Sequence, residues 1–219
     1  MKSELKKRVV TSLFLISLLI IMYLYSFVLI VSLIVIGMIT WVEFYALISK
    51  ILIKKSLKDK FFRFLYKSIS LLYLSLLIYL IFYIEASNIW NRYLIYSLLV
   101  SILSDIGGLI IGKIFKGRKL TKISPKKTIS GSIGSFVFAL LLIPIFYIKL
   151  IEYDFSILVL ITILISLTSQ LGDLFISYLK RKAKVKNTSD ILPGHGGFLD
   201  RIDGIIFAIP VGILLFNFF

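Results

Sequence analysis

Long apolar runs, separated by short basic segments, follow one another along the whole chain. Several runs reach about 18 residues or more, the length that crosses a bilayer core of about 30 Å. The first run, from Val9 to about Ile48, is too long for one span and predicts two helices joined by a tight turn near residues 23–26. We expect further spans at about 68–84, 92–112, 130–148, 155–178 and 203–218. The pattern therefore predicts an all-α, polytopic transmembrane helical bundle of about seven spans.

Composition agrees with this class and limits the chemistry. Of the 219 residues, 59% are hydrophobic and 17% are charged, whereas soluble domains are about half apolar and a quarter charged. The chain has no Cys and one His, which excludes thiol nucleophiles, Cys-held zinc and multi-histidine metal sites. The basic start resembles a signal peptide, but no small-residue cleavage site follows it, so we expect an uncleaved anchor.

The basic residues predict the orientation in the membrane. There are 26 Lys and Arg against 11 Asp and Glu, a net charge of +15, which in a soluble protein would suggest nucleic-acid binding. Here all of them except Arg92 and Lys149 fall in segments that are cytoplasmic if the N-terminus is cytoplasmic. This is the positive-inside pattern. We therefore expect no nucleic-acid partner, a multi-pass protein of the cell (inner) membrane, and an active site that faces the cytoplasm.

Two parts of the chain are expected to differ in their roles. Residues 1–95 are predicted to form three N-terminal membrane helices. Residues 96–219 are predicted to form a catalytic membrane domain, with cytoplasmic loops at 113–128 and 180–202.

Four acidic residues lie in or beside predicted spans, where an ionisable side chain is expensive unless it is paired or hydrated: Glu43, Asp105, Asp173 and Asp203. Such residues indicate function by default. For Glu43 the alternative is a structural ion pair with a Lys or Arg near the cytoplasmic surface. For Asp105 the alternative is a buried hydrogen bond at a helix crossing. A face of small residues follows Asp105 and would let another helix approach closely: Gly107, Gly108 and Gly112.

Asp173 belongs to a polar stripe on an otherwise apolar helix. Gln170, Ser177 and Lys180 share its helix face, because the four residues are spaced i, i+3, i+7 and i+10. A solvated helix end would be polar all round. A stripe that faces a cavity is therefore the better interpretation.

The next segment places three glycines around the single histidine: Gly194, His195, Gly196 and Gly197. Such a backbone has few steric limits and can bring its N–H groups close to a phosphate. Asp200 and Asp203 follow at i, i+3, and with Asp173 they form a set of hard oxygen ligands suited to Mg²⁺. The alternative, a glycine-rich turn followed by a capping acid, leaves the Gly-His-Gly-Gly run unexplained.

The loop at 113–128 is strongly basic and ends in Ser124-Pro125-Lys126-Lys127-Thr128. Most of its cations need only set the topology. Pro125 restricts the backbone just before a span, and Lys126 and Lys127 lie at headgroup depth. Lipid or nucleotide phosphate is the natural counter-ion there.

Taken together, these motifs resemble the phosphatidate cytidylyltransferase (CDP-diacylglycerol synthase) family. The resemblance covers about residues 100–210, with a weaker match at Trp41-x-Glu43. Its strongest part reads Ser177-x-x-Lys180-Arg181, Lys186-Asn187-x-Ser189 and Pro193-Gly194-His195-Gly196-Gly197-x-x-Asp200-Arg201-x-Asp203. Three further motifs precede it in the family's order: Asp105-x-x-Gly108-x-x-x-Gly112, Ser124-Pro125-Lys126-Lys127-Thr128-x-x-Gly131 and Gln170-x-Gly172-Asp173.

The resemblance implies transfer of the cytidylyl group of CTP to phosphatidic acid in the bilayer, which gives CDP-diacylglycerol and pyrophosphate for phospholipid biosynthesis. It implies Mg²⁺ held by Asp173, Asp200 and Asp203; a second cation, monovalent or divalent, and a homodimer are left open. The expected catalytic residues are Asp173, Asp200, Lys180, Arg181 and His195. The expected substrate-binding residues are Ser124, Lys126, Lys127, Thr128, Gly194, Gly196, Gly197, Arg201, Ser177 and Asp105.

This chain departs from the family pattern at three positions. Asn187, Ser130 and Ile176 stand where the family usually has an acidic residue, so no metal or phosphate contact is expected from them. Two other functions stay open: an ion-coupled carrier, and a lipid or polyprenol kinase of related architecture. Against a carrier, the intramembrane acids cluster at one membrane face and the two halves show no inverted repeat.

Overall fold

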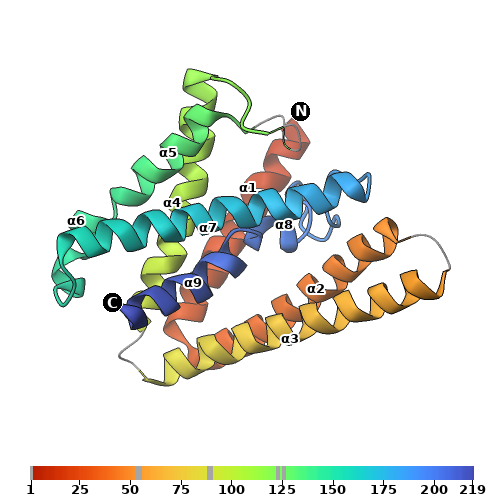
Figure 1. Ribbon diagram of the computed structural model, residues 1–219, viewed down its shortest axis with the longest axis horizontal. Helices are drawn as coiled ribbons and strands as arrows, with labels where there is room; N and C mark the ends of the chain where they lie inside the picture. The colour runs from red at the N-terminus through yellow and green to blue at the C-terminus, as the bar shows by residue number, and fades with distance from the viewer. Residues whose placement is uncertain (1, 53–55, 88–90, 122–123, 125–126) are drawn as a thin grey trace. The chain divides into compact units, whose positions relative to one another are not determined.

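The computed structural model describes residues 2–52, 56–87, 91–121, 124 and 127–219. It is a helical protein (Figure 1), and β-pairing in the described part is limited to isolated bridges. The elements are α1 (Lys2–Leu24), α2 (Ser26–Ile51), α3 (Leu57–Ser87), α4 (Asn91–Phe115), α5 (Ile129–Leu140), α6 (Ile143–Phe146), the short 3₁₀ helix η1 (Tyr147–Leu150), α7 (Phe155–Lys182), α8 (Leu199–Ile202) and α9 (Ile205–Phe218). Pro125 and Lys126, the latter an expected substrate-binding residue, lie outside the described residues.

Six helical segments in the described part are long and apolar enough to cross a membrane: Lys6–Leu24, Ser26–Ile51, Leu57–Ala86, Asn91–Phe115, Ile129–Leu150 and Phe155–Lys182. They confirm the all-α polytopic class and six of the expected spans. The expected turn between the first two is also confirmed, since the extended residue Tyr25 separates α1 from α2.

Two expected boundaries differ in the structure. The span expected at 203–218 is the helix α9, but its 14 residues amount to about 21 Å at about 1.5 Å per residue, which is shorter than the bilayer core. Helix α3 begins at Leu57 instead of near residue 68. Its first turns carry Lys58 and Arg63 beside exposed Phe61 and Phe62, so the helix continues beyond the purely apolar run that marked the span.

The described chain divides into two units. The first combines Met1–Glu85 with Leu179–Ile202, and the second combines Ala86–Tyr178 with Asp203–Phe219. The segment that contains the glycine-rich motif therefore packs with the N-terminal helices. The division into N-terminal helices and a catalytic domain near residue 95 is a functional statement and stays a prediction.

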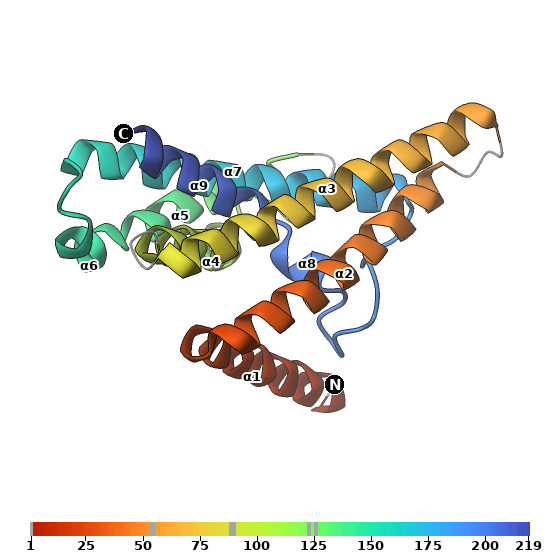
Figure 2. The same cartoon turned by 90° about the horizontal axis from the view of Figure 1, so that it is seen from below.

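In the first unit, α2 and α3 form an antiparallel pair (Figure 1). Ser26 donates to Glu85 at one end at 3.2 Å, and the Trp41 indole donates to the Lys67 carbonyl toward the other end at 3.1 Å. Helices α1 and α2 diverge from the bend between them like the arms of a V (Figure 2). The segment from the end of α7 to α8 contacts both helices, and these contacts hold the glycine-rich motif against the N-terminal helices.

In the second unit, α4 and α5 cross at glycines. A Cβ atom on Gly107 would lie 2.4 Å from the Gly134 carbonyl oxygen, and one on Gly131 would lie 2.8 Å from the Gly108 carbonyl oxygen. Both are closer than real Cβ contacts, so backbone meets backbone here. The predicted small-residue face on α4 is confirmed, and its partner is α5.

Buried hydroxyl pairs join α4 to α7. Ser101 and Ser169 are 2.7 Å apart, Ser104 and Ser166 are 2.9 Å apart, and both pairs are fully buried. Hydroxyls that satisfy one another let polar residues stay inside an apolar bundle. These hydroxyl pairs, together with the crossing of α4 and α5, fix the relative positions of α4, which carries Asp105, and α7, which carries Asp173.

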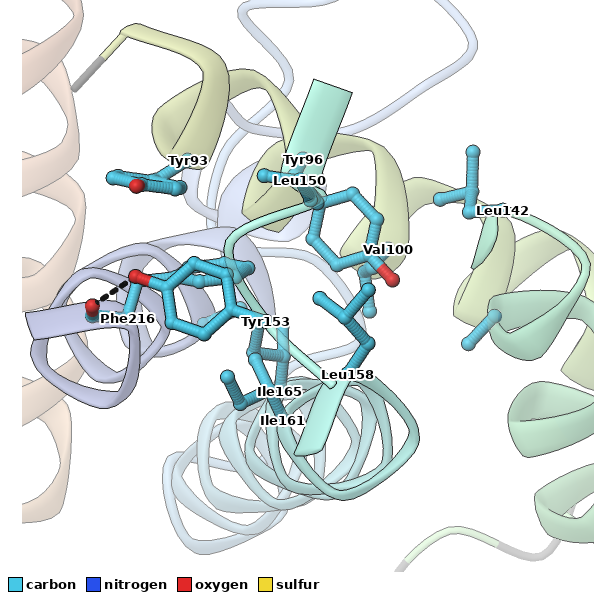
Figure 3. Packing of buried hydrophobic residues seen from close by; sticks show 12 residues of the cluster. Tyr93, Tyr96, Val100, Leu142, Leu150, Tyr153, Leu158, Ile161, Ile165 and Phe216 are labelled. Carbon is cyan, nitrogen blue, oxygen red and sulfur yellow. Dashed lines mark hydrogen bonds between the residues drawn. The ribbon is translucent and has the colours of Figure 1, made fainter. Parts of the chain in front are cut away.

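An aromatic cluster lies within the buried hydrophobic core of the second unit (Figure 3). Tyr93 stacks on Phe216 with ring centroids 4.6 Å apart, and the Tyr153 ring meets Phe216 edge-on at 5.3 Å. The Tyr153 hydroxyl donates to the Phe216 carbonyl oxygen at 2.5 Å. These contacts attach α9 to the start of α4 and to the segment after η1.

Candidate active site

The glycine-rich segment between α7 and α8 is a tight turn in the first unit. Leu192 and Gly196 form an antiparallel bridge. Gly194 and Gly196 have φ angles of 77° and 86°, in the left-handed region that glycine adopts without strain. The turn itself therefore requires these two glycines.

The N–H groups of this turn already have acceptors inside the protein. The amides of His195 and Gly196 donate to the Leu192 carbonyl oxygen at 2.9 and 3.1 Å. The Gly197 amide donates to Asp200 Oδ2 at 3.1 Å. The Phe198 amide donates to Glu43 Oε1 at 3.2 Å, and the Leu199 amide donates to Glu43 Oε2 at 2.8 Å. The sequence predicted that these N–H groups can approach a phosphate. In this structure, carboxylates and a carbonyl of the protein are their acceptors.

Asp200 is held by a cation and by the backbone. Its Oδ1 accepts from Lys180 Nζ at 2.7 Å, and the two side chains are 7% and 11% exposed, respectively. Its Oδ2 accepts from the amide and the hydroxyl of Thr188 at 2.9 and 3.1 Å, and from Gly197. Burial alone would raise the pKa of the Asp200 carboxyl, but the bonds from Lys180, Thr188 and Gly197 outweigh burial and hold that pKa below its ordinary value. Asp200 is therefore an ionised, fully oriented carboxylate.

Glu43 of α2 is 3% exposed and binds the same segment. Its Oε1 accepts from the Ser189 hydroxyl at 2.5 Å, and its Oε2 accepts from the Thr188 hydroxyl at 2.9 Å, in addition to the two amides of the turn. Among the described residues no Lys or Arg lies within ion-pair distance of Glu43. Among the residues that the structure describes, hydroxyl and amide donors therefore satisfy the Glu43 carboxylate in place of the expected ion pair.

Helix α1 contacts the other side of the turn. The Thr11 hydroxyl donates to the Pro193 carbonyl oxygen at 2.9 Å, and the Ser12 hydroxyl lies 3.3 Å from His195 Nε2. Arg201 donates to the His195 carbonyl oxygen through Nε at 3.0 Å and through a terminal nitrogen at 2.5 Å. The His195 ring thus contacts the first helix and lies near two cations, Arg201 and Arg8.

We expect His195 to titrate below its ordinary range. Burial, followed by the charges of Arg201 and Arg8, lowers the pKa of the imidazole from its usual value of about 6.5. Because the folded pKa lies below the unfolded one, the stabilisation by the neutral ring is complete above about pH 6.5 and is lost as the pH falls toward the folded pKa. Since this is the single histidine of the chain, an NMR titration of labelled imidazole gives its midpoint directly. Arg201→Gln should raise that midpoint, and a wild-type midpoint at or above 6.5 would contradict the expected environment.

In the second unit, Lys127 forms an ion pair with Asp173, and the two side chains are 26% and 24% exposed. The Ser177 hydroxyl donates to Asp173 Oδ1 at 3.2 Å. The amide oxygen of Gln170 accepts from Ser132 of α5 at 2.5 Å. Two members of the predicted polar stripe of α7 therefore have polar partners outside the helix: Gln170 has Ser132 on α5, and Asp173 has Lys127 in the basic loop.

The other expected substrate residues of this unit are spread out. The Thr128 side chain caps α5, accepting from the Gly131 amide at 3.0 Å, and Ser124 accepts from the Lys127 amide at 3.0 Å through its carbonyl oxygen. Asp105 is exposed, so the alternative that placed it as a buried partner at the helix crossing is wrong.

The three expected metal ligands divide between the units. Asp173 and Asp203 belong to the second unit and Asp200 to the first. Asp203 is 6% exposed and accepts from the Gly204 amide at 3.1 Å. Within the part of the chain that the structure describes, no group of three or more His, Asp and Glu side chains is arranged to hold a metal ion. The metal site stays a prediction.

The positions that depart from the family pattern have ordinary surroundings. Ile176 is 1% exposed and belongs to the apolar interior. The Ser130 hydroxyl lies 3.0 Å from the Thr128 hydroxyl, and Asn187 is exposed. Arg181, an expected catalytic residue, is also exposed.

Sequence reasoning gave no role to the four hydroxyl side chains that contact the turn segment or its acidic partners. Thr188 and Ser189 follow Asn187 in a motif that had already been singled out, and their hydroxyls were a usable signal. Thr11 and Ser12 are two hydroxyls at the start of an apolar run, and nothing in the sequence connects them to residues about 180 positions away.

The chain is similar to known cytidylyltransferases. The sequence model described as "Cytidylyltransferase family" matches residues 1–219. A phosphatidate cytidylyltransferase of Rickettsia bellii is 46% identical over 149 residues, which cover 63% of this chain and 62% of the relative. Those of Staphylococcus haemolyticus and Staphylococcus aureus (strain COL) are 42% and 38% identical over 123 and 133 residues, covering 55% and 59% of this chain and 47% and 51% of the relatives. The chain thus aligns with about half to three fifths of the length of these relatives.

Proposed function

Since the chain belongs to the cytidylyltransferase family, we propose that it transfers the cytidylyl group of CTP to phosphatidic acid and releases CDP-diacylglycerol and pyrophosphate. The observation that carries this proposal is the family match over residues 1–219. The names of the relatives support the lipid substrate. The positive-inside pattern and the apolar helices support a reaction at the cytoplasmic face of the cell membrane, where CTP is available and the acyl chains stay in the bilayer.

The chemistry requires charge neutralisation more than acid–base catalysis. An oxygen of the lipid phosphate attacks the α-phosphorus of CTP, a new P–O bond forms, the bond to the β-phosphate breaks, and pyrophosphate leaves. The attacking phosphate is already ionised, so no external base is needed. Lys127, Lys180 and Arg201 are the cations for this work, and positioning with charge stabilisation accounts for large rate effects in such reactions.

Each of the two main carboxylates is paired with a lysine in the structure: Asp173 with Lys127, and Asp200 with Lys180. Such a pair is suited to substrate exchange. When a phosphate group binds, the lysine can turn to the phosphate and the carboxylate becomes available for a cation. Both partners of each pair are in motifs of the family, which supports this role.

We propose Asp173 and Asp200, with Asp203, as the carboxylates for Mg²⁺. The donor set fits in part: Asp173 is 24% exposed, and Asp200 Oδ1 accepts one bond, from Lys180, so each has a hard oxygen with remaining acceptor capacity. When bound, a divalent ion would neutralise the triphosphate charge. The residues of this chain would orient that complex, and His195 would donate a hydrogen bond to a phosphate oxygen.

An assay with radiolabelled CTP tests the function. Purified protein in vesicles should convert α-labelled CTP to CDP-diacylglycerol and pyrophosphate when phosphatidic acid is present, and should give no lipid product without it. Formation of CDP and a newly phosphorylated lipid would show a kinase. Absence of any CTP-dependent product would contradict the transferase and favour a carrier.

A further inference from the structure

The N-terminal helix α2 reaches the motif segment through one buried carboxylate. Glu43 is separated by about 145–156 positions in the sequence from every group that donates to it. It accepts four hydrogen bonds, two on each oxygen, and this uses the acceptor capacity of a carboxylate in full. A carboxylate that is buried and completely satisfied in this way orders the donors around it.

Close packing shows that the segment is built around Glu43. A Cβ atom on Gly197 would lie 2.5 Å from both oxygens of Glu43 and 2.1 Å from the Thr188 hydroxyl oxygen. Any side chain at 197 would therefore displace the carboxylate. Gly197 is buried, and because it has no side chain, the Glu43 carboxylate can lie against its backbone.

Thr188 links Glu43 to Asp200. Its hydroxyl oxygen lies 2.9 Å from Glu43 Oε2 and 3.1 Å from Asp200 Oδ2, and its amide donates to the same Asp200 oxygen at 2.9 Å. The hydroxyl has a single proton, so it is shared between two carboxylates. A change at Glu43 is therefore transmitted to Asp200 through one side chain.

We propose that Glu43 is a positioning residue: through Thr188 and the amides of Phe198 and Leu199 it holds Asp200 and the glycine-rich turn in the arrangement that CTP meets. This inference rests on the proposed function, because it assigns the held segment to nucleotide binding. It gives the second membrane helix a role in the reaction in addition to anchoring. Glu43 itself touches no substrate group in this role.

Glu43→Gln is the direct test. Glutamine has the same shape, but its NH₂ group would face a backbone N–H, of Phe198 or of Leu199, whichever way the amide turns. We expect kcat/KM for CTP to fall at least tenfold while KM for phosphatidic acid stays within twofold. Hydrogen exchange of the peptide that contains residues 196–200 should become faster, and that of α4 and α5 should not change. The matched control is Glu85→Gln, which removes a carboxylate of the same unit whose hydrogen bond is to Ser26.

Thr188 provides a second test in case Glu43→Gln does not fold. Thr188→Val removes the shared hydroxyl and keeps the shape and the amide, so it should reproduce the loss in kcat/KM for CTP. Thr188→Ser keeps the hydroxyl and should restore most of the rate. The proposal is overturned if Glu43→Gln and Thr188→Val both react with CTP at wild-type rates, or if activity falls while exchange at 196–200 stays as in the wild type. A wild-type protein that forms no CDP-diacylglycerol would refute the proposed function instead, and the exchange measurement would still decide whether Glu43 holds the turn.

Discussion

Asp200→Asn should lower the rate of CDP-diacylglycerol formation by at least about two orders of magnitude, which corresponds to roughly 3 kcal/mol of transition-state stabilisation. Asp200 accepts from Lys180, Thr188 and Gly197, and an asparagine amide can replace only part of this set. Asp173→Asn should have an effect of similar size, because it removes the charge that faces Lys127. The measurement is kcat and KM for CTP with protein amounts matched by quantitation in the membrane.

The two variants should differ in stability. Lys180 and Asp200 are nearly buried, so Asp200→Asn leaves a buried ammonium without its counter-charge, and such a loss typically costs about 3–5 kcal/mol. The Lys127–Asp173 pair is about a quarter exposed, so solvent compensates for much of its loss. Asp190→Asn is the matched control, since Asp190 is an exposed acid of the same segment. If Asp200→Asn reacts like Asp190→Asn, the carboxylate at 200 has no part in the reaction.

Removal of divalent metal with EDTA should abolish turnover, and added Mg²⁺ should restore it. The turn has no Gly-Lys-Ser/Thr sequence of the phosphate-binding-loop type. Its amides from His195 to Leu199 donate within the protein. A triphosphate therefore needs charge neutralisation beyond what the backbone offers, and a divalent ion with the lysines is the available source. The test is product formation in chelated membranes before and after Mg²⁺ is returned.

A control separates the metal from general damage to the protein. Chelation should leave the NMR titration of His195 and the thermal stability of the protein in detergent unchanged, because the helices and the turn are held by side-chain and backbone contacts. Full activity in the presence of excess EDTA would exclude the divalent ion and with it the assigned role of Asp173 and Asp200 as ligands.

Local sequence determined the helices. Each of the six spanning-length helices is an apolar run whose length matches a bilayer, and helix formation in such a run depends on neighbours a few positions away. The same holds for the break at Tyr25, for the N-cap of α5 at Thr128, and for the left-handed glycines at 194 and 196. The small-residue face of α4 was also readable, since three small residues on one face imply a close neighbour.

Only the tertiary structure decided what each polar side chain is bound to. The sequence marked Glu43, Asp173, Asp200 and the glycine-rich turn as exceptional, but it could not show that Glu43 receives the amides of the turn, or that a lysine pairs with each aspartate. The reason is physical: a buried carboxylate must be satisfied, and several cations, hydroxyls and amides can do this equally well. Which of them is near is set by the packing of segments up to about 156 residues apart, and no periodicity or composition records that distance.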